Sequence, residues 1–106
     1  MIMPEHCVQV FLKLSCKLGS QQEMDCIAAL TDTLAEAIEK HEAGEFDGDE
    51  YGDGVCRLFM YGPDADKLFD AIQQPLLASP LSEGGHALKR YGEASDMQAK
   101  KVRADL

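Results

Sequence analysis

The sequence lacks several features that mark particular classes of protein. It contains no tryptophan, and none of its apolar runs approaches the roughly 20 residues of a membrane-spanning helix. The first residues, MIMPEHCVQV, have no basic segment, long apolar segment or small-residue cleavage site of the kind found in signal peptides. These absences predict a soluble cytoplasmic protein that does not associate with a membrane.

Motifs of catalysis and metal binding are also missing. None of the four cysteines (Cys7, Cys16, Cys26, Cys56) forms a C-x-x-C pair, and each lies in an apolar pattern, so we expect free, buried, reduced thiols. A P-loop, G-x-G-x-x-G, G-x-S-x-G and H-E-x-x-H are absent. A Cys7–His86 dyad would require the first and last predicted strands to be neighbours, and no other residue supports it. We expect no catalytic residue, no cofactor and no metal.

Basic residues are scarce, with 10 Lys and Arg against 19 Asp and Glu and a formal net charge of −9. From Glu23 to Asp70, fourteen acidic side chains oppose three basic ones, whereas from His86 onward five basic side chains oppose three acidic ones. An acidic body repels nucleic-acid phosphates and attracts basic proteins or cations. We therefore expect no nucleic-acid binding, and a basic protein is one candidate partner.

The hydrophobic pattern predicts a single domain over residues 1–106. Alternating apolar residues predict a strand over 6–16. A helix is predicted over 21–43, starting after the capping box of Ser20 and Glu23 and stopping at Gly44. A polar edge strand over 45–51 and an apolar strand over 55–61 follow.

The second half of the chain repeats the alternation of helix and strand. A second helix within 63–80 has Asp64 as its N-cap, and Pro75 should bend or end it. A fourth strand is predicted over 85–91, and the tail, 93–106, is either an added helix, an added strand or partly loose. The order βαββαβ predicts an α+β, ferredoxin-like sandwich, in which two helices cover one face of a four-stranded antiparallel sheet. The first and third strands should be central neighbours.

The helix-free face of this sheet, here called the open face, is the predicted working surface. Alternation assigns to it Gln9, Phe11, Lys13, Arg57, Phe59 and Tyr61. RNA-recognition modules also carry aromatics on these two strands, but their glycine-bearing motif is absent from VCRLFMYG. Exposed aromatic patches mark interfaces, so we expect Phe11, Phe59 and Tyr61 to mediate self-association, unless the tail folds back over them.

The stretch GEFDGDEYGDGV, residues 44–55, resembles a cation-binding loop in composition. Its five acidic residues are Glu45, Asp47, Asp49, Glu50 and Asp53. A calcium loop that starts at Asp47 would need an Asp or Asn at its fifth position and a Glu at its twelfth, where Tyr51 and Leu58 stand. We therefore favour a hairpin whose acids serve recognition, with a looser divalent-cation site as the alternative.

In this hairpin the glycines and aspartates are predicted to form the turns. Gly48, Gly52 and Gly54 should supply positive φ angles, and the aspartates should cap the turns. The charges should also keep an edge strand from pairing with other chains.

The segment GEFDGDEYGDGVCRLFMYGPDADKLFDAI, residues 44–72, resembles a family of small uncharacterised bacterial proteins. They share a G-E-[FW]-D-G-x-E-x-G-x-G run, a strand, and Y-G-P-D-A-D-x-L-F. The resemblance implies a ferredoxin-like fold and no particular activity. A looser likeness is to the regulator of ribonuclease activity B, a family of small acidic ferredoxin-like proteins that bind and inhibit an RNA-degrading endonuclease. The D-G-W-G run of that family is absent here, so we transfer no functional residue.

Taken together, these patterns predict a homodimeric, non-catalytic binding or regulatory module that uses the acidic hairpin, the open face or both. Two alternatives stay open. One is a small-molecule-sensing domain with a pocket lined by Lys13, Arg57 and Tyr61. The other is a metal-dependent enzyme that uses the acidic loop.

Overall fold

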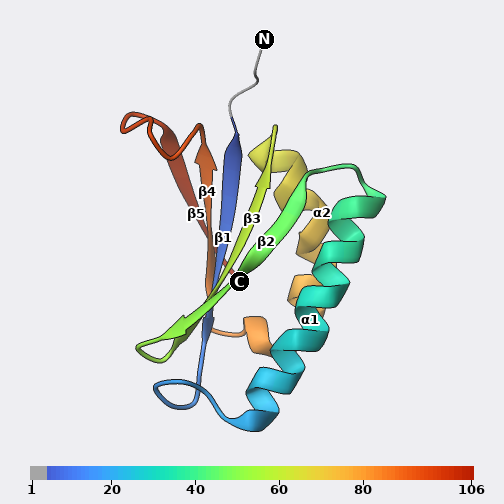
Figure 1. Ribbon diagram of the computed structural model, residues 1–106, viewed down its shortest axis with the longest axis vertical. Helices are drawn as coiled ribbons and strands as arrows, with labels where there is room; N and C mark the ends of the chain where they lie inside the picture. The colour runs from blue at the N-terminus through green and yellow to red at the C-terminus, as the bar shows by residue number, and fades with distance from the viewer. Residues whose placement is uncertain (1–4) are drawn as a thin grey trace.

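The computed structural model describes residues 5–106 as two helices packed on one antiparallel sheet (Figure 1). In chain order the elements are β1 (His6–Lys13), α1 (Gln21–Lys40), β2 (Glu45–Gly52), β3 (Val55–Gly62), α2 (Ala65–Ala78), the short 3-10 helix η1 (Pro80–Ser82), β4 (His86–Tyr91) and β5 (Lys100–Asp105). The strands are ordered β2-β3-β1-β4-β5. Neither helix in this part of the chain is long and apolar enough to span a membrane.

The sheet has five strands rather than the predicted four. The fifth, β5, comes from the tail and pairs antiparallel with β4, which makes the added strand the correct alternative for residues 100–105. The predicted adjacency of the first and third strands is confirmed, since β1 pairs with β3 from His6–Gly62 to Lys13–Val55. Residues 100–105 therefore extend the sheet at its edge, whereas Ala94, Asp96 and Met97 of the preceding loop line a hollow with Gln9, Leu88 and Arg90 of the open face.

The alternation of β1 and β3 separates the two faces of the sheet as predicted. Val8, Val10 and Leu12 have no exposed surface. They share the covered face with Cys56, Leu58 and Met60 of β3, which are equally inaccessible. From the helices, the largest buried side chains of this core are Ile27, Leu34, Ile38, Leu68, Ile72 and Leu76. β1 is shorter than predicted, because it ends at Lys13.

The predicted start of α1 is confirmed in detail. The Ser20 hydroxyl accepts a hydrogen bond from the Glu23 amide, and the Glu23 carboxylate accepts one from the Ser20 amide, which is a capping box. Glu23 also accepts from the amide (2.9 Å) and hydroxyl (2.6 Å) of Ser15. The Ser15 hydroxyl, followed by the Ser20 amide, lowers the pKa of Glu23. The Glu23 carboxylate thus holds both the first turn of α1 and the loop that precedes it.

The end of α1 differs from the prediction. The helix stops at Lys40, and the left-handed residue that follows it is Glu42 (φ 51°), not Gly44. The amide of Glu42 donates to the carbonyl of Glu39, and the amide of Ala43 donates to that of Ile38. These two bonds form a Schellman motif. Gly44 instead allows the backbone to approach β3 closely.

Gly44 and Gly62 lie where the start of β2 crosses the end of β3. A Cβ atom on Gly62 would fall 2.1 Å from the carbonyl oxygen of Ala43. A Cβ atom on Gly44 would fall 2.0 Å from the carbonyl oxygen of Tyr61. Both obstacles are backbone atoms, so no side chain can rotate to make room. The two glycines allow the backbones to touch.

Asp64 caps α2 as predicted, because its carboxylate accepts from the amides of Asp66 and Lys67. A further partner comes from β1, where Nδ1 of His6 accepts from the Ala65 amide at 3.0 Å. Pro75 does not end the helix, which continues to Ala78.

The predicted hairpin is confirmed, and β2 is an edge strand. The turn is formed by Asp53 and Gly54, both with positive φ (54° and 76°), as a two-residue type I′ turn requires. Asp53 therefore does what was predicted for Gly52, which has ordinary φ. A bulge between Phe46 and Gly48 interrupts the pairing of β2 with β3.

All four cysteines are free, as predicted, but only two are buried. Cys7 and Cys56 are inaccessible on β1 and β3, whereas Cys16 and Cys26 are exposed. Cys16 lies beyond the end of β1, and Cys26 lies on the outer surface of α1. The prediction of four buried thiols was wrong because the apolar pattern did not reveal where β1 ends or which side of α1 faces solvent.

Candidate functional site on the open sheet face

Within the described residues no helix lies on the open face (Figure 1). The strand registers arrange its side chains in three rows across the five strands. In the order β2, β3, β1, β4, β5, the first row is Glu45, Tyr61, Cys7, Arg90 and Lys101. The second row is Asp47, Phe59, Gln9, Leu88 and Arg103, with Asp47 placed by the bulge. The third row is Glu50, Arg57, Phe11, His86 and Asp105.

The rows give the open face an uneven distribution of charge. We call Glu45, Asp47 and Glu50, all on β2, the acidic strip. We call Arg90, Lys101 and Arg103, on β4 and β5, the basic strip. The aromatic side chains lie between the two strips. One edge of the face is thus negative, the opposite edge is largely positive, and the centre is mainly aromatic and apolar, with Arg57, Gln9 and His86 among these side chains.

The predicted interface residues of β1 and β3 do meet on this face. Phe11 pairs with Arg57, and Phe59 pairs with Gln9, while Tyr61 lies one row further along β3. Phe11, Phe59 and Tyr61 are all partly buried. The Phe11 ring stacks on His86 of β4, with ring centroids 4.4 Å apart. The aromatic rings are therefore held by neighbours while part of their surface faces outward.

Lys13, predicted to share a pocket with Arg57 and Tyr61, lies at the far end of β1. It lines a small hollow of about 100 Å³ next to Gly84 and His86, and Tyr61 lines a different cavity. The pocket predicted for a sensing domain is therefore not formed by Lys13 and Tyr61 together.

The five acidic residues of the hairpin separate. Glu45, Asp47 and Glu50 join the open face, and Glu50 lies 3.6 Å from the Arg57 guanidinium. Asp49 faces the other way, opposite Leu58, and Asp53 is in the turn. Among residues 5–106, no three His, Cys, Asp or Glu side chains converge as a metal site would require.

On the covered face, Asp49 influences the half-buried Tyr51 and the buried Cys56. Burial, followed by the nearby charges of Cys56 and Asp49, raises the pKa of Tyr51 to about 12. Burial, followed by the charge of Asp49, raises the pKa of Cys56 to about 11. Both groups are neutral at physiological pH, so Cys56 does not act as a thiolate nucleophile.

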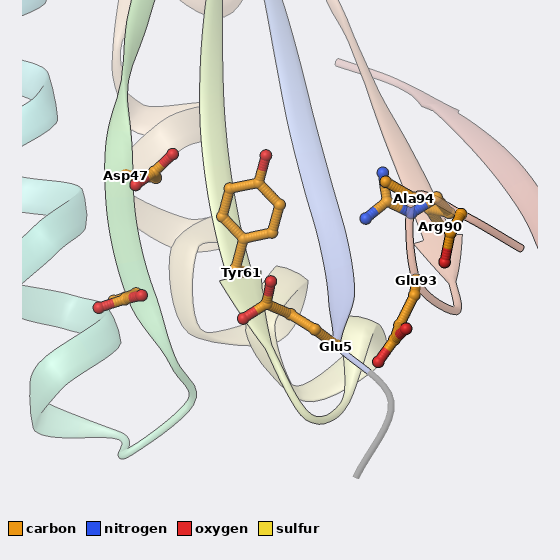
Figure 2. Close-up of a pocket in the computed structure, with 8 residues that line it drawn as sticks. Glu5, Asp47, Tyr61, Arg90, Glu93 and Ala94 are labelled. Carbon is orange, nitrogen blue, oxygen red and sulfur yellow. The ribbon is translucent and has the colours of Figure 1, made fainter. Parts of the chain in front are cut away.

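A cavity of about 500 Å³ opens at the first-row end of the face (Figure 2). Its lining includes Tyr61, Arg90 and four carboxylates, namely Glu5, Glu45, Asp47 and Glu93. In Figure 2 the Arg90 side chain extends from β4 toward β1 and Tyr61. Its Nε donates to the carbonyl of Gly92 at 2.8 Å, which fixes its orientation. With four carboxylates around one guanidinium, the cavity favours a cationic group.

The groups beside this cavity suit recognition better than covalent chemistry. Burial raises the pKa of Cys7, so its thiol is protonated at neutral pH. Burial, and then the charges of Cys7 and Asp47, raise the pKa of Tyr61. The Cys7–His86 dyad is not formed, although β1 and β4 are neighbours, because Cys7 pairs with Arg90 and His86 pairs with Phe11. The cavity therefore offers hydrogen bonds and negative charge.

Sequence analysis missed the β4 and β5 parts of the open face. The alternation of HALKRY, which puts His86, Leu88 and Arg90 on one side, could have identified them. No such signal existed for Lys101 and Arg103, because β5 was not distinguished from a helix or loop. It also missed a latch on the covered face, where Asp66 of α2 accepts hydrogen bonds from Lys89 (3.1 Å) and the Tyr91 hydroxyl.

Comparisons with known proteins add no assignment. The chain matches no protein-family model, no curated protein and no solved structure. The functional interpretation therefore depends on the geometry of the open face.

His86 should make the stability of the fold pH-dependent. Its pKa lies below the ordinary value, chiefly because the ring is partly buried against Phe11 and also because Arg103 is near, although Asp105 opposes the shift. The unfolded chain binds this proton more readily, so the contribution of His86 to stability falls as pH drops through about 6.5. We expect the free energy of unfolding to decrease more between pH 7.5 and 5.5 in the wild type than in His86→Gln. Equal changes in urea titrations of the two proteins would contradict this expectation.

Proposed function

We propose that this protein is a cytoplasmic, non-catalytic binding and regulatory module that forms a homodimer through its open face. We further infer that β1 to β4 are a ferredoxin-like core, to which β5 is an addition. The order β2-β3-β1-β4 and the two helices on one face support this assignment. The likeness of residues 44–72 to the small bacterial proteins supports the same core.

One observation carries the functional proposal. The centre of the open face presents Phe11, Phe59 and Tyr61, only partly buried, between strips of opposite charge. An apolar patch with a polar rim is the usual anatomy of a protein interface. Arginine and aromatic residues, both enriched in interfaces, are adjacent here, as in the pair of Arg57 and Phe11.

The open face suits recognition more than catalysis. The Tyr61 hydroxyl has a raised pKa and stays protonated at neutral pH, and the Cys7 thiol behind it is inaccessible and also has a raised pKa. Charged residues at its rim give specificity and faster association, which a regulatory module needs.

A substitution at the centre of the open face tests the proposal. We expect Phe59→Asp to convert the dimer to a monomer, because an ionised carboxylate would have to be buried in the apolar centre of the interface. Light scattering during size exclusion, over a hundredfold range of concentration, measures the mass. Leu77→Asp on α2, where the side chain is 49% exposed on the other side of the molecule, is the matched control and should leave the mass unchanged. A wild-type protein that is monomeric throughout this range would refute the homodimer.

The cavity of about 500 Å³ favours a second candidate function. Its carboxylates around Tyr61 would accept a small cationic ligand through its ammonium or guanidinium group. This is the form that the small-molecule-sensing alternative takes here, with Arg90 in place of Lys13 and Arg57.

A further inference from the structure

We propose that the homodimer packs open face against open face with its twofold axis parallel to β1, so that the acidic strip of each copy lies over the basic strip of the other. This inference rests on the proposed homodimer and specifies its geometry. A second copy of this chain occupies the open face, because the order of charges across the sheet is complementary to itself.

β1 is the middle strand of the five, with β3 and β2 on one side and β4 and β5 on the other. A twofold axis along β1 keeps every row at its own level and exchanges β2 with β5 and β3 with β4. In the first row, Glu45 of one copy then faces Lys101 of the second copy. In the second row, Asp47 faces Arg103. Both side chains are exposed, and Arg103 also pairs with Asp105 of its own chain.

The same exchange matches the apolar centre. Phe59 on β3 faces Leu88 on β4 of the second copy, and Gln9 lies on the axis opposite its own copy. In the first row, Tyr61 faces Arg90, where the guanidinium can lie against the ring. Apolar groups therefore meet apolar groups, and the polar groups at the axis can hydrogen-bond to each other.

The third row is the least favourable of the three. It puts Glu50 near Asp105 of the second copy, but each already has an arginine within its own chain. Glu50 lies 3.6 Å from Arg57, and Asp105 lies 2.9 Å from Arg103. Arg57 would face His86, which burial keeps neutral near pH 7. The repulsion between Glu50 and Asp105 is therefore largely offset by the arginine that each carboxylate already has in its own chain.

A twofold axis perpendicular to the strands gives the opposite result. It places β2 over β2, so that Asp47 faces its own copy and Glu45 faces Glu50. It also places Arg103 over Arg103 on β5. Like charges that face each other across an interface cost several kcal/mol, and the perpendicular axis creates more such contacts than the parallel axis, which favours the parallel arrangement.

The tilt between two packed sheets does not remove the match. Aligned sheets cross at about 30°, which shifts contacts at the sheet edges by up to about one row. Lys101 would then meet Asp47 instead of Glu45, and the signs would stay opposite. Five strands at about 4.8 Å and about 20–25 Å in length present about 500 Å² in projection, so two faces reach the lower range of specific interfaces.

Charge reversal of the first-row pair tests the geometry. Glu45 and Lys101 are exposed and form no ion pair within the described residues, so reversing them should leave the fold intact. We expect Glu45→Lys and Lys101→Glu each to weaken the dimer by at least about tenfold, since each creates two like-charge contacts. The double variant Glu45→Lys/Lys101→Glu recreates two opposite-charge contacts and should restore the dimer to within about threefold of wild type. Sedimentation over a range of concentrations gives the dissociation constants.

The outcomes distinguish the two proposals. A wild-type monomer would overturn the homodimer and this geometry together. A wild-type dimer that Phe59→Asp disrupts but that neither charge reversal weakens would leave the homodimer standing and overturn the geometry. A Glu45→Lys variant that dimerises more tightly than the wild type would also overturn it, in favour of the perpendicular axis, which places Glu45 over Glu50. Raising NaCl from 50 to 500 mM should weaken the wild-type dimer, whereas acid packed over acid would be strengthened by screening.

Discussion

Replacing Gly62 by alanine is expected to lower the free energy of unfolding by about 3 kcal/mol or more, near or above the upper end of overpacking costs. The new Cβ atom would lie 2.1 Å from the Ala43 carbonyl oxygen and 3.3 Å from the Cα atom of Gly44. Relief would require the start of β2 to move away from the end of β3. That movement would disturb the pairing of Glu45 with Tyr61, which lies next to the crossing. Urea denaturation followed by far-ultraviolet circular dichroism measures the change.

Gly52→Ala is the matched control for this substitution. Gly52 is also a strand glycine, its φ is ordinary, and a Cβ atom there would meet nothing within 4 Å. Its substitution should change stability by no more than about 0.5 kcal/mol. If the two variants unfolded at the same urea concentration, the close crossing of β2 and β3 would not be the reason for glycine at position 62.

The second large effect is expected at Leu76, in the last turn of α2. Leu76 has no exposed surface and packs in the core, so Leu76→Ala should cost about 2–5 kcal/mol through lost burial and a residual cavity. Thermal or urea unfolding of the variant gives the value. This loss would consume a large part of the roughly 5–15 kcal/mol that stabilises a typical domain.

The neighbouring Leu77 provides an internal comparison. It belongs to the same helix and loses the same atoms on substitution, but its side chain is 49% exposed. Leu77→Ala should therefore cost less than about 1 kcal/mol. Similar losses at the two positions would mean that α2 is rotated relative to the sheet, because burial alone distinguishes these leucines.

The parts of the fold that could be predicted are those governed by short-range rules. Alternation in β1 assigned Val10 to the core and Phe11 to the open face, because side chains along a strand point to opposite sides. Hydrogen bonds between near neighbours also identified the caps at Ser20 and Asp64. Each of these features depends on fewer than about ten consecutive residues.

The parts that could not be predicted depend on distant contacts. β5 contains only two apolar residues, Val102 and Ala104, and exists because β4 offers it an unpaired edge. Glu42 takes a left-handed conformation that sequence rules give to glycine, since the nearby Gly44 is needed at the crossing. The same limit applies to the site, where the acidic strip was visible in the sequence but the basic strip was not.

The central position of β1 has a consequence for how the chain acquires its structure. β1 is the first strand along the chain, yet its partners end at Gly62 and Tyr91. At a synthesis rate of about 5–20 residues per second, Tyr91 follows Lys13 by about 4–16 s. Until Gly62 has been made β1 has no hydrogen-bonded neighbour, and until Tyr91 has been made it has only β3 and an incomplete core. Folding therefore depends on long-range strand pairing that occurs late in synthesis. The nascent chain is most prone to aggregation while β1 lacks its partner strands.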